Sequence, residues 1–240
     1  VSYNKMLERL SEAFKIQRQF TENAAHELRT PLSLMQIQLD LYNSGKHPGN
    51  DADTIQTIKM VAEQNERLSK MVKTLLDMSE LQTVGRDETI IVNALIDEVL
   101  ADLEPLAQEK NIKLIGKCKD VNMVGSDILI YRLVYNLVEN AIKYNNSGGQ
   151  VIVEAYQKEK QVYLSVEDTG SGIPEELKER VFEPFFRVDK SRSRELGGVG
   201  LGLAFVNEIV RVHDGSIAIR PNPSGGTIIE VQFAVNRTTA

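Results

Sequence analysis

Two stretches near the N-terminus almost lack the residues that interrupt helices. Residues 1–42 contain one proline, Pro31, and no glycine, and residues 50–82 contain neither. Between them, at 43–51, lies the turn-forming sequence Asn-Ser-Gly-Lys-His-Pro-Gly-Asn-Asp. Stretches of this length without breakers favour long helices, so we predict an antiparallel helical hairpin over residues 1–82.

The apolar residues of both predicted helices recur at spacings of three, four and seven, or sums of these, which is close to a heptad pattern. They form one face of each helix, which carries Leu10, Phe14, Ala24, Leu28, Met35 and Leu39 in the first and Val61, Leu68, Val72 and Leu75 in the second. Two antiparallel helices have only each other to cover these faces. We therefore expect two hairpins to associate into a four-helix bundle, which makes the protein a homodimer.

The remainder of the chain has a different pattern, which begins after a short polar linker at 83–89. We predict strands at 90–92, 112–115, 121–124, 151–157, 162–166, 216–220 and 227–234, and helices at 93–110, 127–144 and 199–212. This mixture predicts a second domain over residues 90–240, an α/β sandwich with one mixed sheet covered by helices.

Composition argues against several classes of function. The chain has 28 Lys and Arg against 34 Asp and Glu, so its net charge of -6 argues against a nucleic-acid partner. A single cysteine, Cys118, excludes an internal disulfide and argues against a thiolate-rich metal site. No apolar run approaches the roughly 18 residues that span a bilayer, and the first residues lack the apolar core of a signal peptide.

One face of the first predicted helix combines reactive groups. At about 100° per residue, Leu28 faces the bundle core and His26 points into solvent, with Thr30 one turn further on the same face. We expect Glu27 beside them on this exposed surface, where a carboxylate orients an imidazole and makes it more basic, as suits a nucleophile. Pro31 removes the hydrogen bond to the carbonyl of Glu27 and weakens or bends the helix there. The alternative is an ordinary solvated histidine.

The helix predicted at 127–144 has an apolar side and a polar side. On the polar side, Asn136 and Asn140 stand one turn apart and offer carbonyl oxygens to a hard cation such as Mg²⁺. Lys143, one turn further, can meet a phosphate group. The alternative is a solvated polar face without a ligand.

A glycine-rich segment follows the strand predicted at 162–166. Asp168 lies at the end of this strand, and Gly170 and Gly172 follow it. A buried aspartate at such a place can accept a hydrogen bond from an exocyclic amine, and glycines let the backbone approach a flat base. The alternative is an ordinary Asx turn.

A second glycine-rich segment begins the helix predicted at 199–212. Gly198, Gly200 and Gly202 would lie at its N-terminus, where free N–H groups and the helix dipole bind phosphate. The segment is no P-loop, because no Gly-Lys-Ser/Thr follows the last glycine. The charged residues 188–195 before it predict a mobile lid.

Together these segments resemble the transmitter of two-component sensor histidine kinases. The family boxes match in order: the H box at 26–31, the N box at 136–144, the G1 box at 168–173, the F box at 182–187 and the G2 box at 198–202. The resemblance covers about residues 4–235. It implies a dimerisation and phosphoacceptor hairpin followed by an ATP-binding domain of the type shared with gyrase and Hsp90.

The resemblance also implies roles for single residues. His26 would be the phosphoacceptor that attacks the γ-phosphate of ATP, and Glu27 would be the base that takes the other ring proton. The remaining roles fall to Asn136 and Asn140 for Mg²⁺ and phosphates, Lys143 and Tyr144 for phosphate or nucleotide, Arg187 for the γ-phosphate region, Asp168 for the adenine amine, Thr227 for adenine through water, and Gly170, Gly172, Gly198, Gly200 and Gly202 for the nucleotide-binding loops.

Family members pass the phosphoryl group to an aspartate of a response regulator. Glu27 and Thr30 also resemble the motif of members that dephosphorylate that regulator, in which Thr30 would position the attacking water. Residues 1–12 resemble the end of a HAMP linker. This implies the cytoplasmic portion of a membrane sensor, with its sensor and membrane-spanning segments before Val1.

Two other functions stay open. A non-catalytic, dimeric ATP-sensing scaffold would bind nucleotide without forming phosphohistidine. A gyrase-like ATPase or a serine kinase would share the pocket, and its hydrolysis of ATP would not depend on His26. The other histidines, His47 in the predicted loop and His213 near a predicted helix end, are interpreted as having no catalytic part.

Overall fold

The computed structural model describes residues 2–43, 51–189 and 198–235. The chain divides into two compact units, Val1–Leu76 with Ser193–Val199, and Asp77–Arg192 with Gly200–Ala240. The predicted turn with His47 and most of the predicted lid at 188–195 lie outside the described residues.

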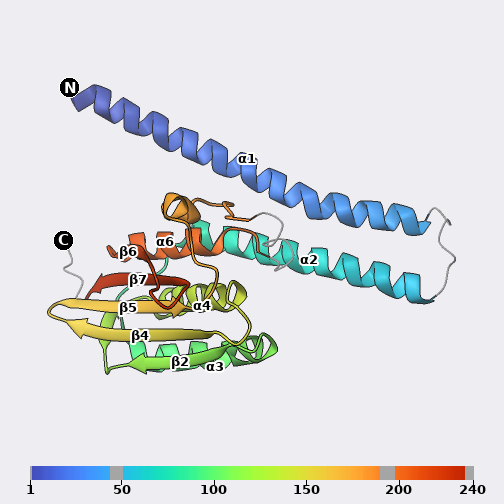
Figure 1. The fold of residues 1–240 in the computed structure, drawn as a ribbon. Coiled ribbons are helices and arrows are strands. Elements are labelled where there is room, and N and C mark those ends of the chain that lie inside the picture. Colours follow the sequence, from blue (N-terminus) through green and yellow to red (C-terminus); the bar gives the residue numbers. More distant parts are fainter. Residues whose placement is uncertain (1, 44–50, 190–197, 236–240) are drawn as a thin grey trace. The chain divides into compact units, whose positions relative to one another are not determined.

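Two long helices form the first unit. Helix α1 spans Ser2–Asn43 and continues through Pro31, and α2 spans Asp51–Glu80 (Figure 1). The predicted helical hairpin is therefore confirmed. The last turn of α2, from Asp77, belongs to the second unit. Within the described ranges, no helix is both long and apolar enough to cross a membrane.

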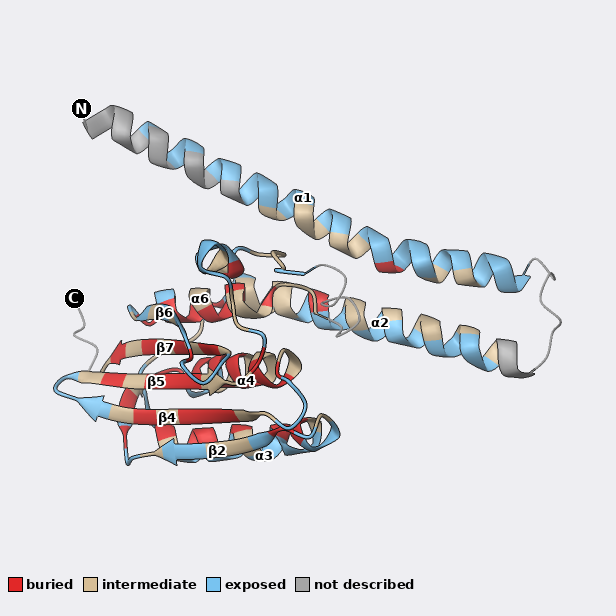
Figure 2. Ribbon diagram, in the orientation of Figure 1, coloured by how far each residue is buried: buried red, intermediate tan, exposed pale blue. Residues whose placement is uncertain are grey.

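Much of the described hairpin is exposed in the single chain (Figure 2), and the exposed residues include many large apolar ones. Of the predicted apolar faces, Leu10, Phe14, Leu39 and Val72 are exposed, and Ala24, Leu28, Met35, Val61, Leu68 and Leu75 are half-buried. Further exposed residues are Leu32, Ile37, Ile55 and Ile58. Apolar surface of this extent is unfavourable in water and is typical of a face that binds a partner.

The second unit is built on a five-stranded mixed sheet. The strands lie in the order β2 (Lys113–Cys118), β4 (Gln150–Lys158), β5 (Gln161–Asp168), β7 (Thr227–Ala234) and β6 (Ser216–Pro221). Strands β2 and β4 pair parallel, and the other pairs are antiparallel. The helices are α3 (Val92–Glu109), α4 (Asp127–Lys143) and α6 (Gly202–Val212), with two short 3-10 turns, η1 (Glu175–Leu177) and η2 (Arg180–Phe182).

One face of this sheet packs against the three helices (Figure 1). Alternate residues point to that face, so Val153, Val166 and Ile229 meet as neighbours on β4, β5 and β7 and are all buried. From the helix side, Leu133 and Leu137 of α4 enter the same core. The predicted α/β sandwich is confirmed.

The prediction of one sheet is wrong in one respect. Strands β1 (Glu88–Ile91) and β3 (Asn122–Gly125) pair with each other in a separate antiparallel sheet. Ile90 lies opposite Met123 in this pair, and both side chains are buried in the common core. Because the apolar side chains of β1 and β3 are already buried in this separate pair, their burial does not require pairing with an edge strand of the large sheet.

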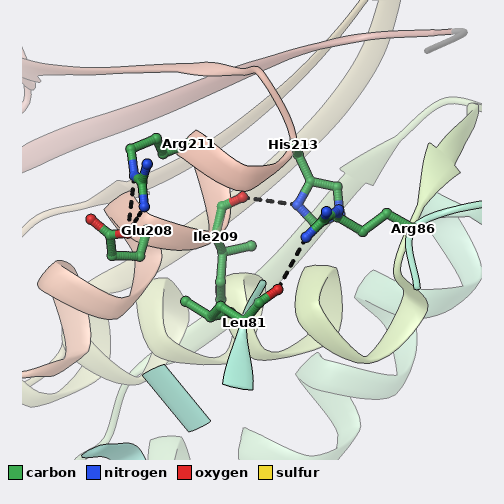
Figure 3. A network of polar contacts seen from close by, with 6 residues as sticks. All are labelled: Leu81, Arg86, Glu208, Ile209, Arg211 and His213. Atoms are coloured by element: carbon green, nitrogen blue, oxygen red, sulfur yellow. Dashed lines mark hydrogen bonds and ion pairs between the residues drawn. The ribbon is translucent and has the colours of Figure 1, made fainter. Parts of the chain in front are cut away.

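A buried histidine connects the end of α6 to the start of α4. The backbone N–H of Ser126 donates to Nε2 of His213 over 3.1 Å. Nδ1 therefore carries the ring proton and donates to the carbonyl oxygen of Ile209 over 2.8 Å (Figure 3). In the same region Arg86 donates to the carbonyl oxygen of Leu81 over 3.0 Å. His213 is thus structural, with both ring nitrogens in hydrogen bonds.

Candidate active site

The first group of candidate residues lies on α1. His26 and Thr30 are exposed, and the Thr30 hydroxyl donates to the carbonyl oxygen of His26 over 3.1 Å. Glu27 is half-buried, and its carboxylate lies 3.8 Å from Nη2 of Arg67 on α2. The expectation that Glu27 shares the exposed surface of His26 is therefore wrong, because one step of about 100° along the helix turns its side chain toward α2. No motif or spacing in the sequence singles out Arg67 as a partner of Glu27.

The second group lies on the polar side of α4. The side-chain amide of Asn136 donates to the carbonyl oxygen of Arg132 over 2.7 Å, so its own oxygen points away from that turn. A methyl group at Gly202 would lie 3.1 Å from Oδ1 of Asn136 and 3.5 Å from Nδ2 of Asn140. The two carboxamides therefore lie next to the first residue of α6.

Helix α6 begins later than predicted. The prediction placed its start near Val199, but the helix begins at Gly202. Gly200 has a φ of +79°, which a right-handed helix excludes, and its carbonyl oxygen accepts the N–H of Phe185 over 2.7 Å. Gly198 groups with the first unit, unlike Gly200 and Gly202. The first N–H groups of α6 have no acceptor within the helix, which suits an anion at this point.

Asp168 lies at the end of β5 and is half-buried. Its Oδ1 accepts the backbone N–H of Gly170 over 2.8 Å and that of Thr227, which is buried, over 3.3 Å. Burial raises the pKa of this carboxyl group, and the two N–H donors oppose the rise only in part. Within the described ranges both hydrogen bonds reach the same oxygen, so Oδ2 can accept a hydrogen bond from a ligand.

The loop after Asp168 packs closely on the end of α4. A methyl group at Gly170 would lie 2.4 Å from the carbonyl oxygen of Tyr144, so only glycine fits there. The buried Asn145 accepts the Thr169 hydroxyl over 3.1 Å, and its amide donates to the carbonyl oxygen of Gln150 over 3.0 Å. Asn145 lies outside the family boxes, and Thr169 lies in the G1 box without a role assigned to it there.

The remaining candidates lie around this loop. Lys143 pairs with Glu139 over 2.9 Å, and Gly172 has a φ of +73°. The Tyr144 carbonyl oxygen accepts the N–H of Ser171 over 3.3 Å. Arg187, the last residue of the F-box segment, is half-buried. The second unit therefore carries every nucleotide-directed candidate except Gly198, and the first unit carries His26, Glu27 and Thr30.

The side chains of Asn136 and Asn140 offer at most two oxygens to a divalent cation. In the part of the chain that the structure describes, no group of three or more His, Cys, Asp or Glu side chains could hold a metal ion. Asn136 presents an oxygen rather than its amide toward the α6 end, and Mg²⁺ prefers a few protein oxygens with waters and phosphates. The Asn136 oxygen therefore suits a Mg²⁺ ion that keeps waters and phosphates, whereas the Asn140 atom nearest Gly202 is its amide nitrogen.

An ion pair supports the helix that carries these asparagines. Asp77 in the last turn of α2 pairs with Arg132 of α4 over 2.5 Å, and both side chains are less than one third exposed. We expect Asp77→Ala to lower the free energy of unfolding by about 1–3 kcal/mol, since it leaves the guanidinium partly buried without its carboxylate. Chemical denaturation measures the change.

The double exchange Asp77→Arg with Arg132→Asp is the control for this pair. It restores opposite charges and should recover part of the loss. If the double exchange destabilised the protein by the sum of the effects of Asp77→Arg and Arg132→Asp, the two side chains would not interact directly.

The chain matches two family descriptions. Residues 16–84 match the His Kinase A (phospho-acceptor) domain, and residues 125–237 match the histidine kinase-, DNA gyrase B-, and HSP90-like ATPase. The signal transduction histidine-protein kinase ArlS of Staphylococcus aureus (strain USA300) is 33% identical over 241 residues, which cover 97% of this chain and 52% of that protein. The chain therefore spans about half the length of the curated relatives it matches.

Solved structures show the same fold. The histidine kinase ThkA, solved in complex with the response regulator protein TrrA, is 25% identical, with a TM-score of 0.76 and coverage of 98% of this chain and 66% of that one. The Acinetobacter baumannii histidine kinase AdeS is 24% identical, with a TM-score of 0.72 and coverage of 88% and 98%. The chain belongs to the histidine kinases of two-component systems and contains both domains of their transmitter region.

Proposed function

We propose that the protein phosphorylates its own His26 from ATP and transfers the phosphoryl group to an aspartate of a response regulator. The observation that carries the proposal is an exposed His26, followed in sequence by Glu27, in a chain whose Asp168 accepts its two backbone hydrogen bonds at Oδ1 alone. The relative ThkA, which was solved with a response regulator, supports the choice of acceptor.

In the proposed nucleotide site, Oδ2 of Asp168 accepts a hydrogen bond from the 6-amino group of adenine. The N-terminus of α6 and Lys143 attract the phosphates, and Asn136 and Asn140 offer oxygens to Mg²⁺. When bound, Mg²⁺ would neutralise part of the negative charge of the phosphates. These groups catalyse mainly by positioning and electrostatics, as phosphoryl transfer requires.

In the proposed reaction, one ring nitrogen of His26 attacks the γ-phosphorus of ATP. The new N–P bond forms as the bond from the γ-phosphorus to its bridging oxygen breaks, and ADP leaves with that oxygen. Glu27 takes the proton from the other ring nitrogen, and Arg67 holds its carboxylate on the side toward α2. Arg187 is assigned to the γ-phosphate because of its place in the F box.

We also propose a homodimer that buries the exposed apolar residues of the hairpin against a second copy. The HAMP-like residues 1–12 support the further proposal that this region is the cytoplasmic portion of a membrane sensor.

The alternatives remain a non-catalytic scaffold and a gyrase-like ATPase or serine kinase. Glu27, Asn140 and Arg187 argue against the scaffold, because a binding module has no use for a base and a γ-phosphate ligand.

The proposal is tested by incubating the protein with γ-labelled ATP and Mg²⁺ and mapping the modified residue. The expected product is label on His26 that acid removes and base preserves. Nucleotide binding without any label would favour the scaffold. Steady release of phosphate without labelled protein would favour the ATPase.

Thr30 is expected to separate two activities. Its hydroxyl is exposed one turn from His26, where it can position a water for attack on a phosphorylated regulator. We expect Thr30→Ala to retain labelling of His26 within about twofold and to lose most dephosphorylation of the regulator, on the order of tenfold or more. The rate of phosphate loss from a phosphorylated regulator measures this, with Thr21→Ala as the matched control, since Thr21 makes the same bond to Gln17. Equal dephosphorylation by both variants would contradict the role of Thr30.

A further inference from the structure

The turn between β6 and β7 reaches back to the aspartate of the nucleotide site. Asn222 is only 6% exposed, and its side-chain amide donates to the main-chain carbonyl oxygen of Asp168 over 2.7 Å. The two residues lie 54 positions apart in the chain. This bond is short for a neutral amide donor, and it acts on the residue proposed to recognise adenine.

The turn is folded around the Asn222 side chain and backbone. Its Oδ1 accepts the N–H of Ser224 over 2.9 Å, its N–H donates to the carbonyl oxygen of Gly226 over 3.2 Å, and its own carbonyl oxygen accepts the N–H of Gly225 over 2.9 Å. Both polar ends of the carboxamide are thus in hydrogen bonds, so its orientation is determined.

Gly226 allows this turn to approach Asp168. Its φ is +94°, and a methyl group there would lie 2.2 Å from the carbonyl oxygen of Asp168 and 2.6 Å from its Oδ1. The next residue, Thr227, donates its N–H to Oδ1 of Asp168 over 3.3 Å. The turn therefore contacts both the backbone and the carboxylate of the same aspartate.

We propose that Asn222 is a positioning residue that sets the preference of the site for adenine over guanine. The inference rests on the proposed nucleotide site. Asn222 holds the Asp168 backbone, so Thr227 and Gly170 can keep Oδ1 and leave Oδ2 toward the base. Adenine presents a 6-amino donor to that oxygen, and guanine presents a 6-oxo acceptor that the carboxylate repels. The preference for adenine over guanine therefore requires that the Asp168 carboxylate keep a fixed orientation toward the base.

The test is calorimetric binding of ADP and GDP to the whole 240-residue chain. We expect Asn222→Ala to weaken ADP binding about tenfold and GDP binding by less than twofold, which narrows the ratio of the two affinities about fivefold or more. With ATP as substrate, KM should rise while kcat at saturation stays within about twofold. A variant that merely loosened the fold would weaken both nucleotides together.

Gln157→Ala is the matched control, because Gln157 makes the same kind of bond, to the carbonyl oxygen of Glu159, in the turn between β4 and β5. If Asn222→Ala does not fold, Asn222→Asp serves for the same comparison, since it keeps an oxygen to accept the N–H of Ser224 and loses the donor to Asp168. An unchanged ADP to GDP ratio in the folded variant overturns the role of Asn222. A wild-type protein that binds both nucleotides equally overturns the adenine site and this role together. Absence of labelled His26 with an intact preference for ADP overturns only the kinase proposal.

Discussion

Asp168→Asn is expected to weaken ADP and ATP binding on the order of 100-fold, or about 2.8 kcal/mol. The asparagine oxygen can still accept the N–H groups of Gly170 and Thr227. Its amide nitrogen then takes the place of Oδ2 and meets the 6-amino group donor to donor. A charge-assisted hydrogen bond is lost and a buried donor is left without an acceptor, and each effect costs about 1–3 kcal/mol. Calorimetric titration with ADP measures the affinity.

The same substitution is expected not to lower the stability of the nucleotide-free protein. The pKa of Asp168 is raised above its ordinary value by burial, so the folded protein holds the proton to higher pH than the unfolded chain does. The free energy of unfolding therefore falls as pH rises from the pKa of this group in the unfolded chain to its raised pKa in the folded protein, and it stays lower above that range. At neutral pH the buried charge of Asp168 destabilises the folded wild type, whereas the asparagine variant has no charge at this position. A variant that lost binding because it unfolded would contradict the assigned role.

The raised pKa of Asp168 also predicts how binding depends on pH. The protonated carboxyl group can no longer offer a charged acceptor at Oδ2, so ADP affinity in the wild type should fall as pH decreases through that pKa. Asp168→Asn should show no such decrease. Parallel pH profiles for the two proteins would assign the titration to another group.

The fold was predictable where a residue pattern is local. Long stretches without breakers predict α1 and α2, and alternating apolar residues predict β4 and β7. The pairing of strands is not local. Nothing in the short apolar segments around Ile90 and Met123 distinguishes a partner in the large sheet from the separate pair that they form. The start of α6 was misplaced for a local reason, because the left-handed φ of Gly200 is compatible with a turn but not with the helix.

The site was predictable only in part for the same reason. Motif spacing singles out Asp168 and Asn136, which have recognisable neighbours in sequence. Asn222 reaches Asp168 from 54 residues away, and Arg67 reaches Glu27 from the other helix of the hairpin. A carboxamide in a turn with proline and glycine looks like a turn former. Only the tertiary structure shows its hydrogen bond to Asp168.

His26→Gln is expected to remove all phosphoryl label from the protein and to leave ADP affinity unchanged. Glutamine keeps a polar side chain with good helix propensity but has no nucleophilic nitrogen. His26 is exposed on α1, so the substitution should change stability by no more than about 0.5 kcal/mol. Label from γ-labelled ATP, read after acid and base treatment, gives the first result, and calorimetry gives the second.

Two further variants and the burial of His213 make this result specific. His47→Gln should retain full labelling, and His213 cannot substitute as nucleophile, because it is buried with both ring nitrogens hydrogen-bonded. Glu27→Gln should slow labelling by about 10²–10⁴ without abolishing it, since it removes a base and leaves the nucleophile. Label that survives in His26→Gln would refute the phosphoacceptor. ATP hydrolysis at an unchanged rate in that variant would instead identify an ATPase, because only a reaction with water as the acceptor can proceed without the imidazole.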